Sequence, residues 1–159
     1  MPRRSRACPW WEPRPSTLRR GARCDHEPGE FPKRLIRRYY DDVLTHRRLD
    51  VFEHLIAPDF VGHDPSGATM DRVGYHDAVR MLHDGFGSLV VKIDDQIAEH
   101  DRVTTRWTAT GLHTGTFAGI GPTWREVTIS GIDIHRLDGD RVVEMWEQLD
   151  LASLLAQLL

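Results

Sequence analysis

The chain has 159 residues, which is enough for one ordinary domain with a hydrophobic core. Hydrophobic residues make up 40% and charged residues 28%, the composition of a soluble globular protein. Residues 1–30 carry seven Arg and four acidic residues, whereas residues 31–159 carry 14 basic and 20 acidic residues. The acidic domain argues against a nucleic-acid partner, because such binding depends on neutralising phosphates.

The N-terminal segment, residues 1–29, is rich in Arg and Pro and has no sustained periodicity, so we predict a disordered leader followed by one domain over 30–159. This leader holds both cysteines and lacks the apolar stretch of a secretory signal. No part of the chain approaches the ~18 apolar residues of a membrane span. We therefore expect a cytoplasmic protein with no membrane partner.

Three helices are predicted next. Apolar residues at four-residue steps predict a helix over 30–46, namely Phe31, Leu35, Tyr39 and Val43. Asp50 is a candidate N-cap for a short helix over 51–57, which Pro58 would end. After an extended segment at Phe60–His63, Asp71 begins a third helix that runs to about Phe86.

The pattern then changes to a period of two, which predicts four strands over residues 89–100, 103–113, 126–136 and 142–149. A Gly-rich loop separates the second and third strands, and an Asp-Gly turn at residues 138–139 joins the last two as a hairpin. Asp150 then caps a short apolar helix. Helices followed by long antiparallel strands predict an α+β fold, in which a twisted sheet curves over the helices as a cone with a pocket.

The last strand contains the carboxylate that most needs an explanation. Alternation places Val143, Met145 and Glu147 on one face and Val142, Glu144 and Trp146 on the other. Glu147 therefore extends an apolar row. A carboxylate buried in such a row has a raised pKa and can act as a general base near neutral pH.

Several segments resemble a known family. They are Phe60–Pro65 (FVGHDP), His113–Thr123 (HTGTFAGIGPT) and Asp140–Trp146 (DRVVEMW), followed by Asp150 and an apolar ending. Together they resemble the SnoaL-like polyketide cyclases, or ester cyclases, of the NTF2-like superfamily, over about residues 31–158. The resemblance implies an NTF2-like cone, a homodimer formed through the outer sheet face, and an apolar cavity for a hydrophobic small molecule, with no cofactor and no metal.

Well-known members of this family close the last ring of aromatic polyketide methyl esters by an intramolecular aldol reaction. The resemblance places their catalytic Asp at Glu147 and a cavity His at Asp133, so this chain departs from the family at both positions. Their His-x-Gly sequence matches His113-Thr-Gly115. The candidate catalytic residues are therefore Glu147, Asp133 and His113. The candidate substrate-binding residues are His63, Trp107, Phe117, Ile120, Met145 and Trp146.

The sequence is also compatible with other interpretations of these residues. Glu147 could face solvent at a frayed strand end, and Asp133 could form a structural ion pair with Arg106 or Arg125. If the register of the last two strands allows, Asp133 and Glu147 could instead lie close together. Their interaction would then leave one of them protonated and the other ionised. The whole protein could be a cofactor-free cyclase, an epoxide hydrolase or ketosteroid-type isomerase, or a non-catalytic binding or dimerisation module, because fold alone does not fix function.

Overall fold

The computed structural model describes residues 29–159, so the predicted leader lies outside the described residues except for Gly29. The helical elements are α1 (Glu30–Arg38), the π-helix η1 (Tyr39–Thr45), α2 (Leu49–Leu55), α3 (Arg72–Gly85) and α4 (Leu151–Leu158). The strands are β1 (Ile56–His63), β2 (Thr69–Asp71), β3 (Phe86–Glu99), β4 (Arg102–His113), β5 (Glu126–Asp138) and β6 (Arg141–Leu149). Among these residues, every helix is too short or too polar to span a bilayer.

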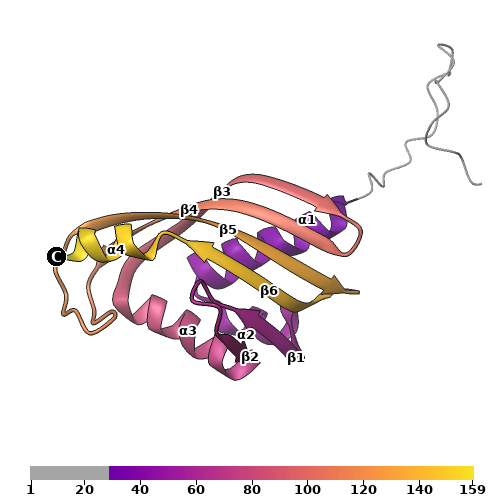
Figure 1. The fold of residues 1–159 in the computed structure, drawn as a ribbon, viewed down its shortest axis with the longest axis horizontal. Helices are drawn as coiled ribbons and strands as arrows, with labels where there is room; N and C mark the ends of the chain where they lie inside the picture. Colours follow the sequence, from indigo (N-terminus) through magenta and orange to yellow (C-terminus); the bar gives the residue numbers. More distant parts are fainter. Residues whose placement is uncertain (1–28) are drawn as a thin grey trace, which may run out of the picture.

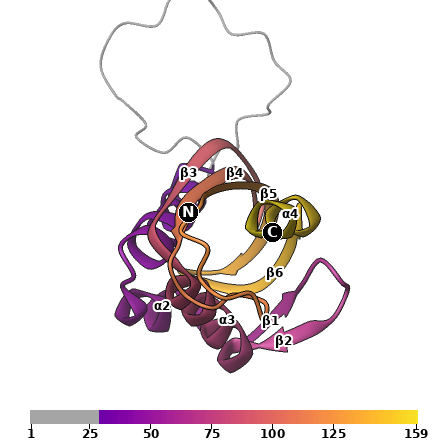
Figure 2. The same ribbon diagram turned by 90° about the vertical axis from the view of Figure 1, so that its left-hand side faces the viewer.

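The strands form one curved sheet in the order β2-β1-β6-β5-β4-β3. Strands β3 to β6 curl around the interior, and the N-terminal helices and α3 close its open side (Figures 1 and 2). The predicted α+β cone is therefore confirmed. The sheet differs from the prediction in two respects, because the short strand β2 is added at one edge and β1 runs parallel to β6.

The first helix has the predicted extent but not a uniform geometry. Residues Tyr39–Thr45 form a π-helix, whose wider turn brings the neighbouring side chains of Tyr39 and Tyr40 inward together. Phe31, predicted to lie on the buried stripe, is instead 44% exposed. The change of helical geometry therefore supplies the interior with a second tyrosine that the four-residue periodicity did not predict.

The boundaries of the second helix also differ from the prediction. Arg48 rather than Asp50 occupies the N-cap position of α2, without a side-chain capping bond. Asp50 lies in the first turn, and the helix ends at Leu55. Pro58 lies within β1, where the pairing with β6 shifts register between Ile56 and Val61. A residue without an N–H is tolerated at such an irregularity.

The predicted start of the third helix at Asp71 and the predicted cap at Asp150 are confirmed. The carboxylate of Asp71 accepts a hydrogen bond from the Gly74 N–H at 2.9 Å at the start of α3. The carboxylate of Asp150 accepts one from the Ser153 N–H at 3.0 Å at the start of α4. Both bonds satisfy donors that the first helical turn leaves free.

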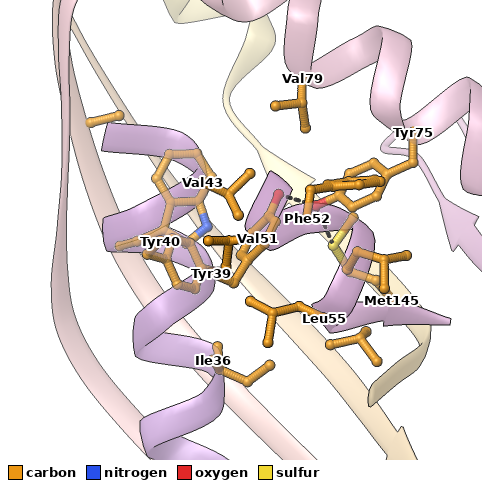
Figure 3. Close-up of a cluster of buried hydrophobic side chains, with 14 of the residues drawn as sticks. Ile36, Tyr39, Tyr40, Val43, Val51, Phe52, Leu55, Tyr75, Val79 and Met145 are labelled. Atoms are coloured by element: carbon orange, nitrogen blue, oxygen red, sulfur yellow. Dashed lines mark hydrogen bonds between the residues drawn. The ribbon is translucent and has the colours of Figure 1, made fainter. Parts of the chain in front are cut away.

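A β-bulge in β6 corrects the predicted faces of this strand. Arg136 pairs with Glu144 but Leu137 pairs with Val142, so Val143 is the extra residue. Val142 is consequently fully buried and shares the inner face with Met145 and Glu147. The inner face packs on the hydrophobic cluster between the sheet and the helices, part of which is shown in Figure 3.

Candidate active site

The interior of the cone contains a cavity of about 260 Å³ between the sheet and the helices η1, α3 and α4. Most of its wall is apolar, with Leu44, Val79, Leu82, Leu89, Ala109 and Ile129 among the lining residues. Met81 and Leu151 also line it and are 61% and 42% exposed, which places them at its rim. The cavity therefore opens to solvent between α3 and the start of α4.

Two carboxylates lie side by side in this apolar wall. Asp133 on β5 and Glu147 on β6 are direct cross-strand partners, and both line the cavity. Side chains paired in this way on one face have Cβ atoms ~4.5–5.5 Å apart. The register of β5 and β6 thus brings the two carboxylates together, the alternative that the sequence had left open.

Asp133 is only 3% exposed and is fixed by two donors. The Tyr40 hydroxyl and the Trp107 indole N–H, the latter at 2.8 Å, both donate to Oδ2, whereas Oδ1 is buried without a partner. The alternative ion pair of Asp133 with Arg106 or Arg125 does not form, because Arg106 pairs with Asp94 and Arg125 donates to the Gln157 carbonyl. Asp133 is therefore held by neutral groups only.

Gly131 makes the position of Trp107 possible. A Cβ atom on Gly131 would lie 2.5 Å from Cζ2 of Trp107, because the indole crosses β5 directly over this residue. The absence of a side chain at Gly131 thus lets the indole reach the Asp133 carboxylate two residues further along the strand.

The carboxylates belong to a polar row that crosses the inner sheet face. Gln96, Thr105, Asp133 and Glu147 are successive partners on β3, β4, β5 and β6. The Gln96 side-chain amide donates to Thr105 Oγ1 at 3.1 Å. The inner face on both sides of this row is largely apolar, apart from the buried rings of His113 on β4 and His135 on β5.

Burial raises the pKa of both carboxyl groups. The pKa of Asp133 rises to about 8, first through desolvation and then through the negative charge of Glu147, and the two hydrogen-bond donors reduce the rise. Desolvation raises the pKa of Glu147 to about 7. Because the groups interact, the two titrations belong to the pair, which holds one proton near neutral pH.

Tyrosines surround the pair on the helix side. The Tyr39 and Tyr75 hydroxyls hydrogen-bond to each other, and Tyr75 also donates to the sulfur of Met145 at 3.2 Å (Figure 3). His135, next to Tyr39, is almost fully buried, and this burial lowers its pKa to about 3. The cavity wall near the carboxylates is therefore rich in neutral hydroxyl and ring groups.

The other predicted site residues fall into two groups by position. The residues of the first group line the cavity or lie next to it. Trp107 and Phe117 line the cavity, Ile120 pairs with Phe117 in the Gly-rich loop, and Met145 is buried behind Tyr75. His113 is fully buried outside the lining, where its Nδ1 accepts the Thr123 N–H at 3.2 Å. Its contacts anchor the loop at residues 114–125.

The second group lies on the outer sheet face. The ring of His63 stacks on Trp146 with centroids 5.2 Å apart, and His63 Nε2 lies 3.0 Å from a Glu144 oxygen. Arg136 donates to the other Glu144 oxygen at 2.9 Å. Neither His63 nor Trp146 is among the cavity-lining residues, because alternation along β6 turns Trp146 away from the Glu147 side.

Sequence reasoning missed Tyr40, Tyr75 and Gly131 as parts of the site. The only signals were the adjacent Tyr39-Tyr40 pair in a helix and a glycine in the interior of a predicted strand. An isolated glycine in a strand often marks a close approach by another group.

A possible cation site lies elsewhere. In the part of the chain that the structure describes, Asp41, Asp42 and His46 bring ligand atoms within 4.8 Å of one another. They lie on the surface, and Asp42 is already paired with Arg38 and Arg48. These contacts explain the cluster without a metal.

Comparisons with known proteins identify the family and the fold. A family model described as SnoaL-like polyketide cyclase matches residues 34–158. No protein with a curated description matches the sequence.

Solved structures with the same fold are numerous. IdmH, a candidate polyketide cyclase from Streptomyces antibioticus, is 29% identical with a TM-score of 0.72, covering 80% of this chain and 97% of its own. AclR, a candidate hydroxylase from Streptomyces galilaeus, is 25% identical with a TM-score of 0.74, covering 79% of each chain. A candidate SnoaL-like cyclase from Jannaschia sp. CCS1 is 22% identical with a TM-score of 0.77, covering 84% of this chain and 96% of its own.

Proposed function

Because the chain belongs to the SnoaL-like polyketide cyclase family, we propose that it is a cofactor-free cyclase that closes a ring in a hydrophobic carbonyl compound by intramolecular aldol reaction. Glu147 is the general base and Asp133 the general acid. The observation that carries the proposal is the cross-strand pairing of these two carboxylates in an apolar cavity.

The proposed reaction begins with ionised Glu147 and protonated Asp133. Glu147 removes a proton from a carbon next to a carbonyl group, and the resulting enolate carbon attacks a second carbonyl carbon of the same molecule. The oxygen of that second carbonyl becomes an alkoxide and takes the proton of Asp133. The products are a ring alcohol, a protonated Glu147 and an ionised Asp133.

The contacts of Asp133 support its role as the acid. Both neutral donors point at Oδ2, so the acidic proton is placed on Oδ1, which has no partner among the described residues. A proton on Oδ1 is available to a substrate oxygen or to Glu147. Exchange of this proton between the adjacent carboxyl groups would restore the starting state without a cofactor.

Exchange of a carbon-bound proton tests the base without knowledge of the natural substrate. A two-ring aryl ketone such as 1-tetralone is incubated with the protein in heavy water, and deuterium entry next to the carbonyl is followed by NMR. We expect acceleration by the wild-type protein and loss of about 10²–10⁴-fold in Glu147→Gln, the range for a positioned base.

Glu144→Gln is the matched control, since it removes a carboxylate three residues away on the same strand but on the outer face, where His63 and Arg136 hold it. Its exchange rate should equal that of the wild type. Equal rates in Glu147→Gln and the wild type would exclude Glu147 as the base. The absence of any acceleration would favour the non-catalytic binding module.

A further inference from the structure

The charge balance of the cavity is one-sided. Among the described residues that line it, the only groups with a charged form near neutral pH are Asp133 and Glu147, and no Lys, Arg or His is present. The two donors to Asp133, Tyr40 and Trp107, are neutral. The wall can therefore carry negative charge but supplies no positive charge.

The nearest arginines on the same strands do not compensate this charge. Arg106 points to Asp94 on the outer side of β4, at 3.3 Å, and Arg136 is bound to Glu144 on the outer face. A carboxylate in an apolar wall without a cationic partner is costly. A ligand that brings its own positive charge lowers this cost, whereas an anionic ligand raises it.

We propose that this cavity binds a hydrophobic amine in its ammonium form, with the nitrogen between Asp133 and Glu147 and one or two rings in the apolar part. This ligand class goes beyond the carbonyl chemistry proposed above and requires no turnover. Amine binding can therefore fail or succeed independently of the exchange reaction.

The hydrogen-bonding groups fit an ammonium nitrogen. It has three N–H donors and no acceptor. When Asp133 is ionised, its Oδ1 is a buried acceptor without a partner among the described residues, and Glu147 supplies a second carboxylate on the neighbouring strand. Bonds from a charged donor to a carboxylate are about twice as strong as neutral ones.

The volume of the cavity limits the ring system. An engineered apolar cavity of about 150 Å³ holds one benzene molecule. A cavity of about 260 Å³ accordingly has room for two fused rings. Because the apolar wall continues to Met81 and Leu151 at the rim, the rings are placed toward the opening and the nitrogen at the polar row.

Three molecules of similar shape test the proposal by calorimetry at about pH 8, where the amine is protonated and the pair carries at least one charge. They are 1-naphthylmethylamine, 1-naphthylmethanol and 1-naphthoic acid. We expect the amine to bind at least about tenfold more tightly than the alcohol, and the acid at least about tenfold more weakly. Equal affinity of amine and alcohol, tightest binding of the acid, or no binding of any of the three would overturn the proposal.

Variants locate the binding site. Glu147→Gln and Asp133→Asn, each confirmed as folded by circular dichroism, should lose most of the preference for the amine while still binding the alcohol. Asp41→Asn removes a carboxylate from the exposed Asp41/Asp42/His46 cluster and should leave the amine affinity unchanged. If Asp41→Asn weakens amine binding and the two cavity variants do not, the amine binds at the surface and the proposal is wrong.

Discussion

Stability should fall as the pH rises above neutrality, because folding buries the two carboxyl groups. Their folded pKa values, about 8 for Asp133 and about 7 for Glu147, exceed the ordinary values of 3.8 and 4.5. Above about pH 5 the unfolded chain has lost these protons and the folded protein still holds them. The stabilisation that comes from these bound protons is therefore present in full at low pH. It is lost as the pH rises through the folded-state pKa values of Asp133 and Glu147.

The magnitude follows from the linkage relation. Between about pH 6.5 and 8.5, loss of the Asp133 proton costs about 2 kcal/mol and loss of the Glu147 proton about 1 kcal/mol. His135 acts in the opposite direction, because its pKa is about 3 in the folded protein and ordinarily 6.5. Below about pH 6.5 the unfolded chain binds a proton at His135 that the folded protein does not, so this residue favours folding more as the pH rises. Between about pH 6.5 and 8.5, His135 adds less than about 0.5 kcal/mol to the free energy of unfolding, so the expected net loss is about 2–3 kcal/mol.

Urea unfolding followed by tryptophan fluorescence at about pH 6.5, 7.5 and 8.5 measures this loss. The double variant Asp133→Asn/Glu147→Gln should be nearly insensitive to pH over the same window, because an amide does not titrate. A wild-type stability that is flat or rises with pH, or an equal slope in the double variant, would refute the burial argument.

Two further substitutions test the supports of the site. Gly131→Ala places a Cβ against the Trp107 indole, so it should lower the free energy of unfolding in urea by about 1–3 kcal/mol and slow the ketone exchange. The control Gly121→Ala, which has open space around it, should lower the free energy of unfolding much less. Equal losses would contradict the close-packing argument. Asp150→Ala removes the cap of α4 and should lower the free energy of unfolding by about 1 kcal/mol, which a lower Tm detects, and an unchanged Tm would show that the cap contributes nothing.

Local chemistry made the starts of α3 and α4 and most of the strands predictable from sequence. Asp71 and Asp150 bond donors three residues ahead, so the interaction that defines the helix start lies within one short segment. Strands β4 and β5 alternate clearly because one face packs on the core. The inward direction of Glu147 followed from the same alternation.

The features that complete the site depend on contacts between distant segments. The pairing of Asp133 with Glu147 depends on the register of the hairpin, and the inward turn of Val142 depends on a bulge in it. Tyr40 is 93 residues from Asp133 and reaches it from the π-helical part of the first helix. No local pattern encodes these relations, because each is settled by how two elements pack.

The last strand shows how one element supports two electrostatic environments. Glu144 on its outer face is held by His63 and Arg136, and these contacts lower its pKa. Glu147, three residues later, lies in the apolar wall, and desolvation raises its pKa to about 7. A base suited to neutral pH needs the second environment, since the first would leave a weakly basic carboxylate. The curvature that encloses β6 is therefore what makes Glu147, and not Glu144, fit for proton transfer.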